Sequence, residues 1–330
     1  MEERIDKLVN LDIGGRGSEY LYKAAREVTG EPLAMAAARR FIGLKPGETV
    51  LLTTGFPARC RISPRIGEND GPAGAAVLAM ALQRAFGIVP VVAMDEALIP
   101  PVSAVFRSAG FNILSLEEAR RAADCSSKTA AAVLCSYPTE DAEALDSADP
   151  LLDRLQPKVA VAVERPGRNR AGIYHDMKGL PLGNGEARVD LLFERALDRR
   201  IPVVAFGDGG NEIGMGLVLD AVREHVPFGR KCLCDCGAGI AARTRADVLV
   251  TAAISNWGCY AVVACLSILL KDRRLLHTPE AESRLLMAGV QAGLINSVEG
   301  TVDPGVDGLP LETNVAMVQL LHTMATKAIG

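Results

Sequence analysis

Four glycine-bearing loops carry most of the side chains in this sequence that could do chemistry. Each loop follows a short apolar run, and together they supply carboxylates, amides and an arginine. Crowded carboxylates can exchange protons with a substrate, because one acid among several neighbours has a raised pKa, or they can bind a divalent cation. The four loops are GENDG (67–71), ERPG (164–167), GDGGNE (207–212) and SNWG (255–258).

The loop GDGGNEIGMG (207–216) has the glycine content of a phosphate-binding loop without its pattern. A dinucleotide fingerprint needs glycine where Glu212 stands, and the Gly-Lys pair of a Walker loop is missing. Asp208 and Glu212 would also place two negative charges beside a phosphate. We therefore expect Gly209 and Gly210 to allow close backbone approach, and the acids to receive a proton, an ammonium group or a cation. Helix capping is the alternative interpretation.

The loop at 67–71 has the same character. Glu68 and Asp70 lie just before Pro72, which suits the first turn of a helix. Three arginines lie upstream and could hold carboxylates in bidentate fashion, or could simply be solvated. They are Arg59, Arg61 and Arg65.

The other two loops add an ion pair, an amide and an aromatic ring. Glu164 and Arg165 could act on a substrate or form a salt bridge at the sheet edge. Asn256 could bind substrate or cap a helix, and Trp257, the single tryptophan, could line a pocket or fill the core. The loop at 303–308 could border the site or serve as a connector.

The segment at 168–185 is long for a connection inside a compact domain, so it is a candidate lid or binding loop. Its His175 could be a general base or a surface imidazole. Cys232, Cys234 and Cys236 alternate as they would on one face of a strand. They could begin a zinc site, although no further His or Cys lies close by in sequence, or they could be packing thiols.

Short apolar runs alternate with helical stretches along the chain, which predicts an α/β fold: a mostly parallel, doubly wound sheet with helices on both faces. We expect residues 1–330 to form a single domain, and the pattern is also compatible with two lobes. Ligands of such sheets bind beyond the carboxyl ends of the strands. The predicted strands are Thr49–Thr54, Ile88–Met94, Ala131–Ser136, Val159–Glu164, Pro202–Phe206 and Val248–Ala253. The predicted helices include Pro72–Phe86, Ala187–Arg200, Asn211–His225, Asn256–Leu270 and Glu312–Ala328.

Composition narrows the class of protein. The 330 residues are 49% apolar with a formal net charge of −4, which gives no reason to expect nucleic acid or an anionic membrane as a partner. The longest apolar run, 261–270, is about half of the ~20 residues that a membrane span needs. The first residues lack the apolar core of a signal peptide. We expect a cytoplasmic protein with reduced thiols and a small-molecule substrate, and an oligomer is compatible with the sequence.

Taken in order, GENDGPAGA (67–75), ERPG (164–167), GDGGNEIGMG (207–216) and SNWGCYA (255–261) resemble the D-glutamate cyclase family, over about residues 45–310. One position departs from the family pattern, in which the first loop reads ETDG, because Asn69 stands between the two acids. The resemblance implies a hydro-lyase that reversibly converts D-glutamate to 5-oxo-D-proline and water.

This reaction needs a base for the ammonium group, an acid or metal for the γ-carboxylate, and donors that fold the substrate back on itself. We expect the acids to transfer protons and to bind the ammonium group, and Arg165 to bind the α-carboxylate. The expected catalytic residues are Glu68, Asp70, Asp208 and Glu212. The expected substrate-binding residues are Asn69, Glu164, Arg165, Gly209, Gly210, Asn211, Asn256 and Trp257.

The sequence requires no cofactor, but Mg²⁺ or Mn²⁺ could instead neutralise the acids, held by Asp208, Glu212 and Asp70. Two other functions fit less well. A metal-dependent phosphoryl-transfer enzyme acting on a small acid would need a phosphate loop with lysine, which is not recognisable. A protein that binds an amino acid without turnover would use the same loops at the carboxyl ends of the strands.

Overall fold

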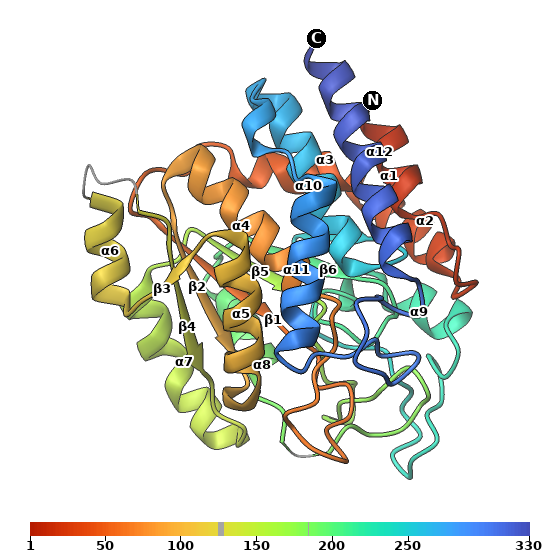
Figure 1. Ribbon diagram of the computed structural model, residues 1–330. Helices are drawn as coiled ribbons and strands as arrows, with labels where there is room; N and C mark the ends of the chain where they lie inside the picture. Colours follow the sequence, from red (N-terminus) through yellow and green to blue (C-terminus); the bar gives the residue numbers. More distant parts are fainter. Residues whose placement is uncertain (125–128, 184) are drawn as a thin grey trace.

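A seven-stranded parallel sheet forms the centre of the computed structural model, which describes residues 1–124, 129–183 and 185–330 (Figure 1). The strand order β3-β4-β2-β1-β5-β6-β7 confirms the predicted doubly wound α/β class. Every strand pairing is parallel. The strands are β1 (Thr49–Thr54), β2 (Val89–Met94), β3 (Asn112–Ile113), β4 (Ala131–Ser136), β5 (Val159–Val163), β6 (Val203–Gly207) and β7 (Val248–Thr251).

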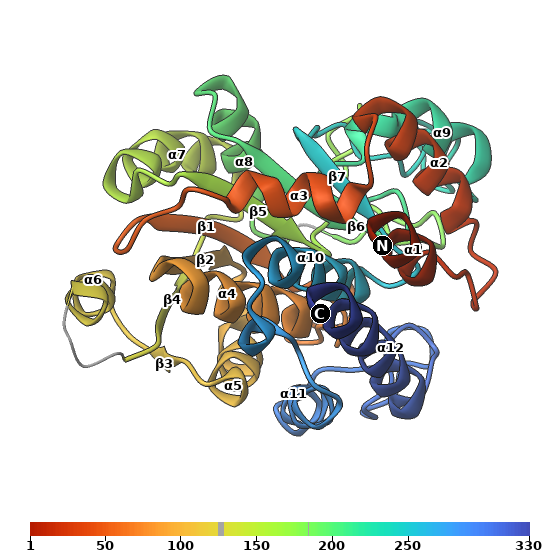
Figure 2. The ribbon, with the colours of Figure 1, turned by 90° about the horizontal axis from the view of Figure 1, so that it is seen from above.

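Helices cover both faces of the sheet. Figure 2 shows α4, α5 and α10 against one face, and α7 and α8 against the other. Among the described helices, none combines the length and apolar character needed to cross a bilayer. The α-helices are α1 (Glu2–Val9), α2 (Ser18–Thr29), α3 (Leu33–Phe41), α4 (Pro72–Phe86), α5 (Ile99–Ala109), α6 (Leu116–Asp124), α7 (Asp141–Leu155), α8 (Val189–Asp198), α9 (Leu219–His225), α10 (Ser255–Leu270), α11 (Pro279–Gln291) and α12 (Leu311–Ile329).

The central strands are apolar on both faces because both faces are covered. All residues of β1, β2, β5, β6 and β7 are buried. The register pairs Thr54 with Val163 and Val163 with Phe206, so β1, β5 and β6 end at the same level of the sheet. The loops that follow these three strands therefore begin side by side.

Helices α4 and α10 pack closely beneath these loops. Helix α4 begins with Pro72 after Gly71, whose φ of 92° lies in the region that favours glycine. A Cβ atom on Gly74 would lie 2.8 Å from the Cα atom of Asn256 at the start of α10. Glycine is thus required at this helix contact, which fixes the two loops relative to each other.

Two predicted elements are wrong, and one short strand, β3, was not predicted. The predicted helix at 211–225 begins only at Leu219, because Gly210 and Gly214 have φ values of 106° and 102°, outside the helical region. The segment with Cys232, Cys234 and Cys236 is a turn rather than a strand. The other predicted strands and helices are present, with ends that differ by up to two residues.

Candidate active site

The candidate site lies where the chain reverses its direction across the sheet. The strand β1 has β2 on one side and β5 on the other, and such a switch point leaves a crevice beyond the carboxyl ends of the strands. A cavity of about 330 Å³ opens at this position. It is lined by Arg16, Phe56, Ala58, Arg59, Arg61, Glu68, Glu164, Asp176, Met177, Lys178, Asp208, Asn211, Ser297, Val298 and Asp307.

Six carboxyl groups gather at this cavity: Glu68, Glu164, Asp176, Asp208 and Asp307 line it, and Asp70 lies close to two of them. Burial is the main cause that raises the pKa values of Glu68, Glu164 and Asp208 well above their usual values, and repulsion from neighbouring carboxylates adds to it. Asp70 lies close to Asp208 and Asp307, and burial raises its pKa to about 7. Several of these acids are therefore neutral near neutral pH and able to donate a proton.

A single arginine that the sequence analysis missed joins two of these acids. Arg16 Nη2 donates hydrogen bonds to Asp208 Oδ2 at 2.9 Å, to Asp307 Oδ2 at 2.8 Å and to the Ala253 carbonyl at 2.6 Å. Burial alone would raise the pKa of Asp307, but Arg16 and a hydrogen bond from Ser297 outweigh burial and lower it. Asp307 is therefore ionised near neutral pH.

Arg16 could have been suspected only from the glycines beside it, in GGRG (14–17), since this loop lies far in sequence from the four motif loops. The loop at 303–308 was left open between a border of the site and a connector. The structure places its Asp307 in the cavity wall.

Two of the cavity acids have unusual backbone conformations. Glu164 has a φ of 43° and Asp307 a φ of 51°, values that side-chain-bearing residues seldom adopt. At Glu164 the surroundings enforce the conformation: a Cβ atom on Gly71 would lie 2.8 Å from Glu164 Cβ, and Ser255 Oγ donates to Glu164 Oε2 at 2.5 Å. Backbone strain of this kind is concentrated at functional sites.

The glycine-rich loop after β6 binds its own anion. The carboxylate of Glu212 accepts the backbone N–H groups of Asp208 at 3.1 Å, Gly209 at 2.6 Å and Gly210 at 2.6 Å. Those amides would face the phosphate in a phosphate-binding loop. Glu212 therefore shapes the loop and presents Asp208 to the cavity. It does not line the cavity, and neither do Gly209 and Gly210.

Arg165 does not reach the cavity, so its predicted role with the substrate carboxylate is wrong for this structure. Its guanidinium is fully buried and pairs with Asp95, and it also donates to the carbonyl groups of Gly55 and Ala187, each at 2.8 Å. These bonds occupy both terminal nitrogens of the guanidinium inside the protein. Arg165 instead holds the loops after β1, β2 and β5 together.

The predicted amides separate into structural and cavity-lining groups. Asn256 Oδ1 accepts from Gly71 N at 3.0 Å and Gly74 N at 2.6 Å, so Asn256 binds the start of α4 instead of the substrate. Trp257 is completely buried and donates from Nε1 to Asn314 at 2.9 Å, which makes it a core residue.

The remaining two amides differ in their partners. Asn211 lines the cavity and donates from Nδ2 to the His175 carbonyl at 2.7 Å. The side chain of Asn69 is buried, and neither of its polar atoms has a hydrogen-bond partner among the described residues. His175 itself does not line the cavity.

Cations line the same cavity as the acids. Arg59 donates to the carbonyl groups of Ala58 and Ser297, and Arg61 pairs with Asp176 at 2.7 Å. Within the described part of the chain, neither Arg59 nor the exposed Lys178 forms an ion pair with a carboxylate. Both are therefore available to an anionic group of a ligand.

Two overlapping groups of acids are close enough to share a cation. One carboxylate oxygen from each of Asp70, Asp208 and Asp307 lies within 4.8 Å of the others, and the same holds for Glu164, Asp208 and Glu212. Oxygen donors of this kind suit Mg²⁺ or Mn²⁺. The predicted set of Asp70, Asp208 and Glu212 is divided between the two groups, with Asp208 common to both.

Fold and site together define the class: a doubly wound α/β protein with an acidic cavity at its switch point. The sequence matches the family described as D-glutamate cyclase-like, C-terminal, over residues 5–322, and the chain belongs to this family. It is 29% identical to the human protein named D-glutamate cyclase, mitochondrial, over 98% of its own length. The match covers 52% of the human protein, so the chain spans about half the length of this relative.

Proposed function

We propose that this chain catalyses the reversible dehydrative cyclisation of D-glutamate to 5-oxo-D-proline. The observation that carries the proposal is the small cavity at the carboxyl ends of the strands, which is lined both by acids with raised pKa values and by cations that have no carboxylate partner among the described residues. Glutamate carries one ammonium and two carboxylate groups, so the residues that bind it should include both acidic and basic side chains. Family membership supports the same reaction.

The reaction forms the bond between the α-nitrogen and the γ-carbon and breaks one γ-carbon–oxygen bond. The ammonium group loses two protons, and both end on the departing oxygen, which leaves as water. The overall reaction therefore neither takes up nor releases protons, and the enzyme must move protons from nitrogen to oxygen within the site. A cluster that holds both neutral and ionised carboxyl groups is suited to this transfer.

The direction in which each pKa is shifted indicates which acid carries out which step. Asp307, ionised by Arg16, attracts the ammonium group. Asp208 borders the same space, and its contact with Arg16, which opposes the effect of burial, favours the ionised form that accepts a nitrogen proton. Glu164, neutral because it is buried, donates a proton to the γ-carboxylate, with Glu68 beside it. Holding the γ-carboxylate as a neutral acid makes its carbon a better electrophile.

The substrate carboxylates need cations, which the same cavity supplies. Arg59 and Lys178 line the cavity and have no carboxylate partner among the described residues. Binding both ends of the substrate would bring nitrogen and γ-carbon together, and such orientation contributes roughly 7 to 11 kcal/mol in well-placed intramolecular reactions. A divalent cation on the acid groups would provide the alternative means of neutralising the γ-carboxylate.

The test is an assay for 5-oxoproline from D-glutamate and, in parallel, from L-glutamate, with and without EDTA. We expect product from the D-isomer. Activity that disappears with EDTA and returns specifically with Mg²⁺ or Mn²⁺ assigns the acids to a cation, whereas activity that persists assigns them to proton transfer. If a folded sample supplied with either metal forms no product from either isomer, the proposal is wrong.

A further inference from the structure

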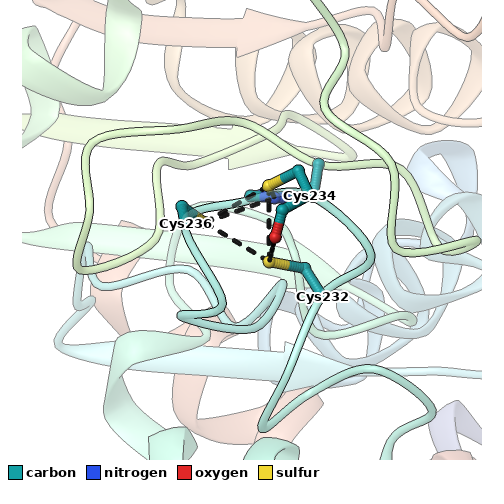
Figure 3. Close-up of side chains that lie close together, drawn as sticks. Cys232, Cys234 and Cys236 are labelled. Carbon is teal, nitrogen blue, oxygen red and sulfur yellow. Dashed lines mark hydrogen bonds between the residues drawn. The ribbon is translucent and has the colours of Figure 1, made fainter.

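Three cysteines and a histidine meet outside the acidic cavity, on two loops far apart in sequence. Cys232, Cys234 and Cys236 converge in one turn (Figure 3), and His175 comes from the long loop after β5. One ligand atom from each of the four residues lies within 4.8 Å of the other three. His175 precedes the cysteines by more than fifty residues, so spacing in the sequence does not reveal it as their fourth ligand.

We propose that these four side chains form a structural zinc site. Three thiolates and one imidazole are a ligand set that structural zinc sites use. Tetrahedral zinc with Zn–S bonds of about 2.3 Å separates two sulfur atoms by about 3.8 Å. The Sγ–Sγ distances here are 3.5 Å for Cys232–Cys234, 3.3 Å for Cys232–Cys236 and 3.3 Å for Cys234–Cys236. The cluster therefore needs only a small expansion to hold the ion.

The histidine is oriented as a zinc ligand. His175 Nδ1 lies 3.1 Å from the Ile173 carbonyl, which fixes a proton on Nδ1 and leaves the lone pair of Nε2 free. Nε2 lies 3.3 Å from Cys234 Sγ and 4.0 Å from Cys236 Sγ, so that lone pair faces the sulfur atoms. Three reduced thiols release their protons when zinc binds, and the neutral imidazole releases none.

Residues around the cluster fix the two loops to each other. Asn169 Nδ2 lies 3.6 Å from Cys236 Sγ and donates to the Gly239 carbonyl at 2.6 Å. Leu233 N donates to the Gly179 carbonyl at 2.8 Å. Outer contacts of this kind commonly orient metal ligands. The ion would add a fourth connection between the loops.

The location connects the zinc site to the acidic cavity. Asp176, Met177 and Lys178 follow His175 directly and line that cavity, and the His175 carbonyl accepts a hydrogen bond from Asn211 in the cavity wall. Zinc would thus hold one wall of the cavity in place. This role is structural, because the cluster itself does not line the cavity.

The experiment measures zinc in the intact protein, purified under reducing conditions and without chelators, by elemental analysis after zinc loading and gel filtration. We expect one zinc ion per chain. Co²⁺ added to metal-free protein should give thiolate-to-cobalt charge-transfer bands and the visible bands of tetrahedral Co²⁺. A wild-type protein without zinc or cobalt bands, or an intact mass that shows a disulfide among these cysteines in the reduced sample, overturns the proposal.

The variants Cys234→Ser and His175→Gln should lose at least ten-fold in zinc affinity, as measured by competition with a chromogenic chelator. Cys135→Ser is the matched control, since Cys135 lies on β4, outside the cluster, and it should retain the ion. Unchanged zinc affinity in folded Cys234→Ser protein contradicts the assignment. Because this readout is metal content, it is independent of cyclase activity, and zinc measured on the EDTA-treated assay samples separates the two effects of chelation.

Discussion

Arg16 provides the sharpest test of the electrostatics, because one guanidinium neutralises two buried acids. The perturbation is Arg16→Gln, which removes the charge and its hydrogen bonds to Asp208, Asp307 and Ala253. The side chains of the two acids are 3% and 7% exposed, so water cannot replace the lost cation. Each acid must then remain charged without a partner or take up a proton.

Removing one member of a buried ion pair typically costs about 3–5 kcal/mol. Arg16 itself is 26% exposed, so solvent screens part of the interaction and we expect about 3 kcal/mol. The loss should depend on pH. In the wild type the pKa of Asp307 is lowered, so Asp307 contributes stability above its unfolded pKa and loses it as pH falls. The difference between wild type and variant should therefore grow from acidic to alkaline pH.

Urea unfolding at several pH values measures this difference. Arg154→Gln is the matched control: Arg154 pairs with Glu117, but both side chains are about 60% exposed, so a change within about 1 kcal/mol is expected. The reasoning is refuted if Arg16→Gln destabilises the protein no more than Arg154→Gln does, or if its effect is the same at all pH values.

Three further predictions concern the loops around the cavity. Glu212→Gln should lower the free energy of unfolding by about 1–3 kcal/mol, because a glutamine cannot accept all three amide hydrogen bonds, and denaturant titration checks this. Gly74→Ala should cost about 1–3 kcal/mol through overpacking against Asn256, whereas Gly14→Ala, with no atom closer than 3.7 Å to the added carbon, should be nearly neutral; equal denaturation midpoints for the two variants would count against the helix contact. Because the pKa of Asp70 is raised to about 7, the native state holds a proton that the unfolded chain has released, so stability should fall as pH rises from about 4 to 7, and this slope should diminish in Asp70→Asn.

The sequence predicted the fold well because its strands are covered on both faces. Continuous apolar runs such as Val159–Val163 are readable without an alignment, and the bounds of β1 and α4 agree with those predicted. The loop after β6 was misread as a helix start because apolar spacing beyond Asn211 suggested one. Its glycine conformations, which only the three-dimensional contacts reveal, delay the helix to Leu219.

The site was predictable in part, for a related reason. The carboxyl-end rule identified Glu68, Glu164 and Asp208, because those residues follow strands that lie side by side. It could not tell which polar side chains point outward: Arg165 and Asn256 face protein partners. Arg16, Asp307 and the pairing of His175 with the cysteines depend on contacts between distant segments, which spacing in one sequence does not encode.

The most direct test of the account measures 5-oxo-D-proline formed from D-glutamate by wild type, Glu164→Gln and Glu299→Gln. The last is the matched control, an exposed glutamate on a neighbouring loop. The account predicts product from wild type and from Glu299→Gln, and a loss of about 100-fold or more in Glu164→Gln, in line with removal of a general acid. Wild-type activity in folded Glu164→Gln protein would contradict the assignment of cyclisation to the acids of the cavity.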